Sequence, residues 1–153
     1  MKKNTLDLQM LLSDNFTLAE FVRSATAERH RISNLPRWEH VLALRNLCQN
    51  VLQPLRNRFG RIIINSGYRC ERLNELVHGV GNSQHMRGEA ADIYIPNMGT
   101  GLQYFDFIRD HTDFDQLLFE YNSKGGRWIH VSCKMDKKLN RYMAIPNYRV
   151  WNR

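Results

Sequence analysis

The sequence predicts an α+β fold in which helices pack against a mainly antiparallel sheet. Three observations support this prediction: helical apolar spacing is concentrated before Gly60, short β-branched or apolar runs follow, and two of these runs flank a glycine-containing turn. With 153 residues, 42% hydrophobic and 24% charged, the chain has the length and composition of one compact domain. We expect an N-terminal arm over residues 1–15, irregular through residue 14, and a single domain over residues 16–153.

Two helices are expected in the N-terminal part of the domain. Residues 17–20 match a capping box, which predicts a helix that continues to about His30. Pro36 stands at a first-turn position and begins a second segment with helical apolar spacing, which ends at Gly60. Pro54 lacks a backbone N–H and is expected to kink the last turn of this second helix or to split it off.

The sheet is expected from the later part of the chain. The expected strands are residues 62–64, 90–95, 116–121, 128–133 and 142–145, with 148–151 as a further candidate, and short helices are expected over 71–77 and 102–111. Residues 122–126 carry turn-forming Asn, Ser and Gly, so they should join two of these strands as an antiparallel hairpin.

The charge of the chain leaves several classes of partner open. A formal net charge of +7 fits a nucleic-acid surface, an anionic polymer partner or ordinary solubility. Lysines and arginines are scattered from Lys2 to Arg153 without a dense block, so no specific nucleic-acid binding is expected. A binder of an anionic polymer or of nucleic acid through this charge is kept as an alternative. No apolar run approaches the roughly 20 residues of a membrane-spanning helix, so no membrane span is expected.

The cysteines and the N-terminal residues indicate whether the protein is expected in a reducing compartment or as an exported protein. Cys48, Cys70 and Cys133 are odd in number and form no C-x-x-C pair, so we expect reduced thiols rather than disulfides or a thiolate zinc site. No apolar signal-peptide region follows Lys2 and Lys3, and the chain is therefore expected to be made without export.

One carboxylate and two histidines stand in apolar surroundings. Asp92 lies between apolar residues in an expected strand, where a buried carboxylate is costly unless a cation or a metal compensates it. His85 precedes it in a loop, and His130 lies in another apolar strand. Catalytic zinc commonly takes three nitrogen or oxygen ligands and leaves one position for water, which matches this set. The alternative is a hydrogen-bonded core histidine with Asp92 in an ion pair.

Three motifs carry a resemblance to a known family. Residues 83–92 read S-x-H-x-x-G-x-A-x-D, residues 66–69 read Ser-Gly-Tyr-Arg, and residues 128–130 read Trp-Ile-His. In this order they resemble the zinc D-alanyl-D-alanine carboxypeptidase family, peptidoglycan metallopeptidases of the hedgehog/DD-peptidase fold. The similarity runs from about Phe16 to Cys133, and it implies one zinc ion per chain held by the two histidines and the aspartate named above.

The resemblance also implies roles for residues around the metal. Arg69 matches the family arginine that binds the substrate and the developing oxyanion, with a structural salt bridge as the alternative. Ser83 and Gln84 are expected to bind the substrate backbone or to orient His85, with turn capping and solvation of a strand edge as the alternatives.

The general base is expected from a strand rather than from the last motif. Many relatives place an acid or a histidine two or three residues before the last ligand, where this chain has Arg127 and Trp128. Glu120 is the nearest candidate, and a hairpin centred near Lys124 would place it opposite Trp128 and diagonal to His130 on one face of the sheet. A strand-end carboxylate in water is the alternative.

The family resemblance therefore implies zinc-dependent hydrolysis of D-amino-acid-containing peptide bonds in peptidoglycan stem peptides, by a carboxypeptidase or an endopeptidase that acts as a monomer. The alternative is an inactive zinc-containing module that binds the cell wall. We expect synthesis in the bacterial cytoplasm and action on the wall after phage-type release, as in endolysins. A secretion signal encoded upstream of Met1 would contradict this route.

Overall fold

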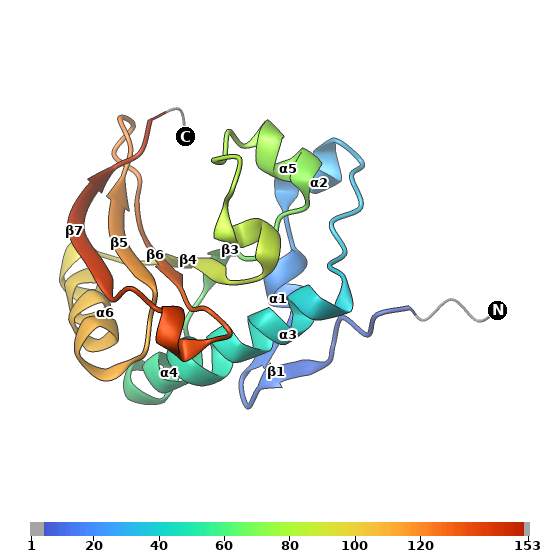
Figure 1. The fold of residues 1–153 in the computed structure, drawn as a ribbon. Coiled ribbons are helices and arrows are strands. Elements are labelled where there is room, and N and C mark those ends of the chain that lie inside the picture. Colours follow the sequence, from blue (N-terminus) through green and yellow to red (C-terminus); the bar gives the residue numbers. More distant parts are fainter. Residues whose placement is uncertain (1–4, 152–153) are drawn as a thin grey trace.

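The computed structural model describes residues 5–151 and has the predicted α+β fold, with a mainly antiparallel sheet (Figure 1). Within these residues, one sheet has the strand order β3-β4-β6-β5-β7, and β1 and β2 form a small separate sheet. The strands are β1 (Leu11–Ser13), β2 (Phe16–Thr17), β3 (Ile64–Ser66), β4 (Ala90–Tyr94), β5 (Gln116–Tyr121), β6 (Arg127–Ser132) and β7 (Met143–Arg149). The helices are α1 (Leu18–Val22), α2 (Ala25–Arg29), α3 (Trp38–Leu47), α4 (Gln53–Phe59), α5 (Glu71–Leu76) and α6 (Met98–His111), with short 3-10 helices η2 (Gln84–Arg87) and η3 (Lys137–Leu139).

The N-terminal segment differs from the expectation in two ways. The expected irregular arm contains β1, which pairs antiparallel with β2 and buries Leu12 in the core; residues 1–4 of that arm lie outside the described residues. The expected helix to His30 is two helices, because Arg23 is extended and the Ser24 side chain caps α2 by accepting a hydrogen bond from Ala27 N at 3.1 Å.

The long second helix is continuous but changes its pitch. A π-helical segment, Cys48–Leu52, joins α3 to α4 immediately before Pro54, which removes one backbone donor and crowds the preceding turn. The helix ends at Gly60, whose φ of +83° is readily adopted by glycine. The helix therefore continues past Pro54, and a π-helical segment stands where a kink or a break was expected.

The central sheet follows the sequence pattern except at its two edges. The expected strand over residues 62–64 is displaced to β3, and Ile63 is 40% exposed, so this apolar run is not buried throughout. At the other edge, one strand, β7, replaces the two short candidates and runs parallel to β5. The hairpin of β5 and β6 has the predicted register, with Glu120 opposite Trp128.

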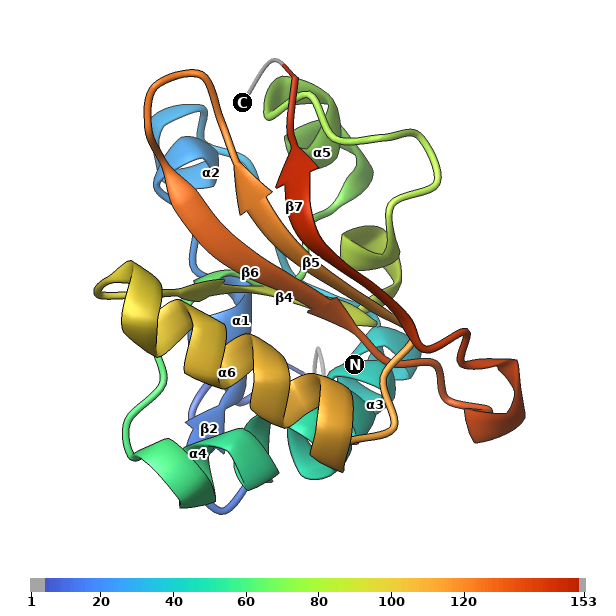
Figure 2. The ribbon, with the colours of Figure 1, turned by 90° about the vertical axis from the view of Figure 1, so that its left-hand side faces the viewer.

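The two faces of the sheet have different neighbours (Figure 2). Helix α6 covers one face, where Phe105 packs against Phe119 with ring centroids 6.3 Å apart. The core on this side also takes Leu117, Ile129 and Val131, all fully buried. Alternate residues of the same strands face the opposite side, toward η2 and α5, and these carry the polar groups considered next. In residues 5–151 we find no helix with the length and apolar character needed to cross a membrane.

Candidate functional site

Three buried side chains from separate segments meet on the polar face of the sheet. Asp92 of β4 lies directly opposite His130 of β6, and His85 comes from η2. One potential ligand atom from each residue lies within 4.8 Å of the others, and no other such group of three occurs among residues 5–151. The three residues are only 1–9% exposed. This cluster could hold a metal ion.

The loop before β4 is shaped to present His85. The Ser83 side chain caps η2 by accepting a hydrogen bond from His85 N at 3.2 Å. Gly88 ends η2 with a φ of +74°, and a side chain there would collide with the backbone of His40. These two features set the turn that brings His85 over the sheet.

The hydrogen bonds of the cluster fix the tautomer of His85. Its Nδ1–H donates to the carbonyl oxygen of Gly67 at 2.7 Å, because a carbonyl can only accept. Its Nε2 then carries a lone pair, lies 3.3 Å from Asp92 Oδ1 and makes no hydrogen bond with the described residues. Two acceptors that face each other in a buried site repel, and a shared cation removes this repulsion. The donor set therefore fits a divalent metal ion.

The pKa shifts agree with this fit. Burial lowers the pKa of His85 to about 4, despite the nearby Asp92 carboxylate, so its imidazole is neutral near pH 7. Burial by itself would raise the pKa of Asp92, but its interactions with His85 and His130, including the 3.0 Å hydrogen bond with His130 Nδ1, hold that pKa well below its ordinary value. A neutral imidazole and an ionised carboxylate are the forms that bind metals.

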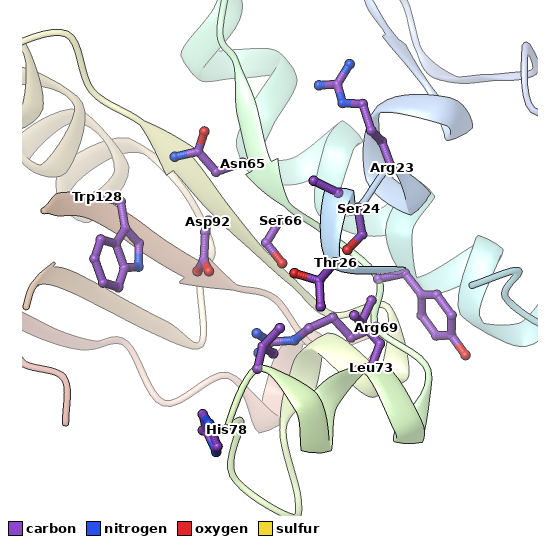
Figure 3. A pocket seen from close by; sticks show the side chains of 13 residues that line it. Arg23, Ser24, Thr26, Asn65, Ser66, Arg69, Leu73, His78, Asp92 and Trp128 are labelled. Carbon is purple, nitrogen blue, oxygen red and sulfur yellow. The ribbon is translucent and has the colours of Figure 1, made fainter. Parts of the chain in front are cut away.

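Arg69 lies next to the cluster in a first cavity, of about 570 Å³, lined by α2, β3 and α5 together with Asp92 and Trp128 (Figure 3). Its guanidinium is buried and donates to Ser83 Oγ at 3.4 Å, while its backbone N–H donates to the carbonyl of His85 at 3.1 Å. The segment that carries Arg69 and the loop that carries His85 are thus tied together.

Glu120 lines a different cavity from Arg69. The confirmed register places it diagonal to His130 on the same face of the sheet, and its side chain is 5% exposed. Together with His85 and His130 it lines a second cavity, of about 750 Å³, bounded by η2, β5, β6 and β7. A carboxylate is therefore available beside the candidate metal ligands.

Ser83 and Gln84 make contacts within the protein. Besides capping η2, the Ser83 hydroxyl accepts from Arg69. Gln84 Nε2 donates to Asp115 Oδ2 at 3.0 Å. Ser83 and Gln84 also line the second cavity. These contacts hold the His85 loop in place, and binding of substrate by either side chain stays a prediction.

Asp115 anchors this loop to the C-terminal segment. Its fully buried carboxylate accepts from Gln84 and forms a bidentate pair with Arg141, with Arg141 Nη2 at 2.8 Å and Arg141 Nε at 3.0 Å. Burial would raise the pKa of Asp115, but hydrogen bonds from Arg141 and Gln84 outweigh burial and lower that pKa. Sequence patterns give no signal for this contact, because Arg141 lies in an irregular segment.

Two sets of residues that line the cavities were not predicted from the sequence. His78 is exposed and has a φ of +59°, yet it lines both cavities. Tyr148 and Arg149 of β7 line the second cavity because β7 pairs with β5. An isolated strand signal cannot reveal a partner that is distant in the chain.

Comparison with known protein families gives a match over most of the chain. The family model described as Peptidase M15 matches residues 14–132, a span that contains the three cluster residues, Arg69 and Glu120. No curated protein matches the chain.

We predict that Asp115→Asn lowers the free energy of unfolding by about 1–2 kcal/mol near pH 7, because the half-exposed Arg141 guanidinium would lose its buried carboxylate and be solvated only in part. Since the folded-state pKa is below the ordinary value, this stabilisation is present above the unfolded-state pKa and is lost as the pH falls through the folded-state pKa. The penalty of the substitution should therefore shrink below about pH 4.

Urea denaturation at a series of pH values measures this effect. Asp106→Asn is the matched control, because Asp106 is 58% exposed on α6 and pairs only with Arg109 among the described residues. A penalty for Asp115→Asn that is absent at neutral pH, or that does not change with pH, contradicts the assignment.

Proposed function

Because this chain belongs to the peptidase M15 family of zinc-dependent peptidases, we propose that it hydrolyses D-amino-acid-containing peptide bonds in peptidoglycan, as a carboxypeptidase or an endopeptidase. The observation that carries the proposal is the buried cluster of His85, Asp92 and His130, set between a buried arginine and a buried glutamate. We propose that the enzyme acts as a monomer on stem peptides of the cell wall.

The cluster is proposed to hold one zinc ion per chain. Two imidazole nitrogens and one carboxylate oxygen form a donor set that suits catalytic zinc, and the Nε2 of His85, which faces Asp92 Oδ1 at 3.3 Å without a hydrogen bond, supports this assignment. Zinc held there supplies Lewis-acid chemistry, in which a water molecule is made more acidic and a peptide carbonyl is polarised. Gly67, whose carbonyl accepts from His85 Nδ1, fixes the orientation of this ligand.

Glu120 is proposed as the general base. Its carboxylate lines the second cavity with His85 and His130, so it can take the proton from the attacking water there. The protonated carboxyl group then donates this proton to the leaving amine, which restores the carboxylate. Trp128 and Arg127, two and three residues before His130, cannot accept a proton, which supports Glu120 in this role.

Arg69 is proposed to bind the substrate. Its guanidinium is permanently charged and lines the first cavity beside Asp92. It can donate hydrogen bonds to the carbonyl oxygen on which negative charge develops, or to a terminal carboxylate. Ser83, which accepts from Arg69 Nη2, orients the guanidinium.

We predict that chelation abolishes cleavage of a D-Ala-D-Ala stem peptide and that zinc restores it, because the cluster supplies the metal. Chromatography of the products and metal analysis of the protein measure the two effects. Asp92→Asn is expected to lose both zinc and activity. Cleavage that is indifferent to chelator would contradict a metal mechanism. Zinc content near one per chain and wall binding without released product would indicate the inactive wall-binding module.

We also predict that Glu120→Gln lowers kcat by on the order of a hundredfold or more, because the amide cannot accept the proton from water. Zinc content should stay near one per chain. Glu89→Gln is the matched control, since Glu89 pairs with the exposed Arg87 at 2.8 Å and has no place in the proposed chemistry. An unimpaired Glu120→Gln enzyme would remove Glu120 from the role of base.

A further inference from the structure

Strand β7 lies beyond the residues that match the family, yet it helps to build the site. The match ends at residue 132, whereas β7 begins at Met143 and pairs in parallel with β5. Its register sets Ile145 beside Leu118 and Tyr148 beside Glu120. Since paired residues of neighbouring strands share a face, β7 extends the face that carries Glu120 by one strand.

This added strand is attached to the sheet at both ends. At its start, Met143 N donates to Asp115 O at 2.9 Å, close to the bidentate pair of Arg141 with the Asp115 carboxylate. Beyond its end, Val150 N donates to Tyr121 O at 2.9 Å. Hydrogen bonds at both ends and the ion pair of Arg141 with the buried Asp115 carboxylate hold β7 in a defined position, as a binding surface requires.

The two cavities are lined by different members of the cluster. Asp92 lines the first cavity, whereas His85 and His130 line the second. His78 lines both, so the cavities adjoin each other next to the cluster. A peptide bound across the cluster would therefore place residues in the second cavity, against β7.

The wall of the second cavity offers a cation with an aromatic neighbour. Arg87 and Arg141 also line this cavity, but each forms an ion pair with a carboxylate of the protein. Arg149 is exposed, takes part in no ion pair among residues 5–151, and lies with its guanidinium carbon 4.0 Å from the ring centroid of Trp151. A guanidinium stacked on an aromatic ring keeps its edge donors available for a carboxylate.

We propose that the end of β7, through Arg149 with Tyr148 beside it, binds a segment of the peptide substrate that carries a free carboxylate. This inference rests on the proposed function, because it assigns the substrate segment of the same site. The charge of Arg149 and the position of Tyr148 beside Glu120 make these two residues determinants of specificity rather than catalytic residues.

The test compares two peptides that end in D-Ala-D-Ala and differ in one upstream residue, glutamate in the first and glutamine in the second. The wild-type enzyme should have a KM about fivefold lower for the glutamate peptide, with similar kcat values. Arg149→Gln should remove this preference by raising the KM of the glutamate peptide to about that of the glutamine peptide. Added salt should weaken the wild-type preference, because the site is exposed.

Arg58→Gln is the matched control, since it removes one charge from an exposed position of α4 that lines neither of these two cavities, and it should keep the preference. Equal KM values for the two peptides in the wild type, or an unchanged preference in Arg149→Gln, overturn the inference and leave the proposed function standing. If the wild type cleaves neither peptide, the proposed function fails. In that case, calorimetry measures the binding of the same two peptides. Tighter binding of the glutamate peptide by the wild type, with no such difference in Arg149→Gln, supports the inference. Equal binding of the two peptides by the wild type overturns it.

Discussion

The structure depends most on one buried carboxylate, Asp92, placed between two imidazoles. Its position is set by the pairing of β4 with β6, which puts His130 directly opposite. The Gly67 carbonyl directs the proton of His85 to Nδ1 and leaves Nε2 facing Asp92 Oδ1 at 3.3 Å. A buried arrangement of acceptors is costly in free energy, and a divalent cation offsets that cost. In the proposed function, the same cation would supply the chemistry of the site.

The rest of the fold holds groups around this carboxylate. The hairpin of β5 and β6 places Glu120 on the same face, opposite Trp128 and diagonal to His130. A buried polar network joins Arg69 to Ser83 and Gln84 to Asp115, so the loop with His85 is fixed from two directions. Strand β7 also lines the second cavity, and its Met143 N donates a hydrogen bond to the backbone carbonyl of the same Asp115.

The sequence predicted the parts of the site that depend on local pattern. The turn over residues 122–126 fixed the hairpin register, and with it the face on which Glu120 lies, because alternation along a strand leaves only one register that buries the apolar residues. Strand pairing between distant segments has no comparable signal, so the parallel position of β7 and the contact of Arg141 with Asp115 required the structure. The break between α1 and α2 was missed, although Ser24 is a local capping signal whose side chain accepts from Ala27 N.

X-ray absorption at the zinc edge of the zinc-loaded protein tests the central claim most directly. The account predicts a first shell of nitrogen and oxygen only, with the outer-shell scattering of two imidazoles, and loss of one imidazole in His130→Ala. Sulfur in the first shell would contradict the account by assigning the ion to a cysteine. A spectrum without imidazole scattering would contradict it as well, because the ion would then lie away from His85 and His130.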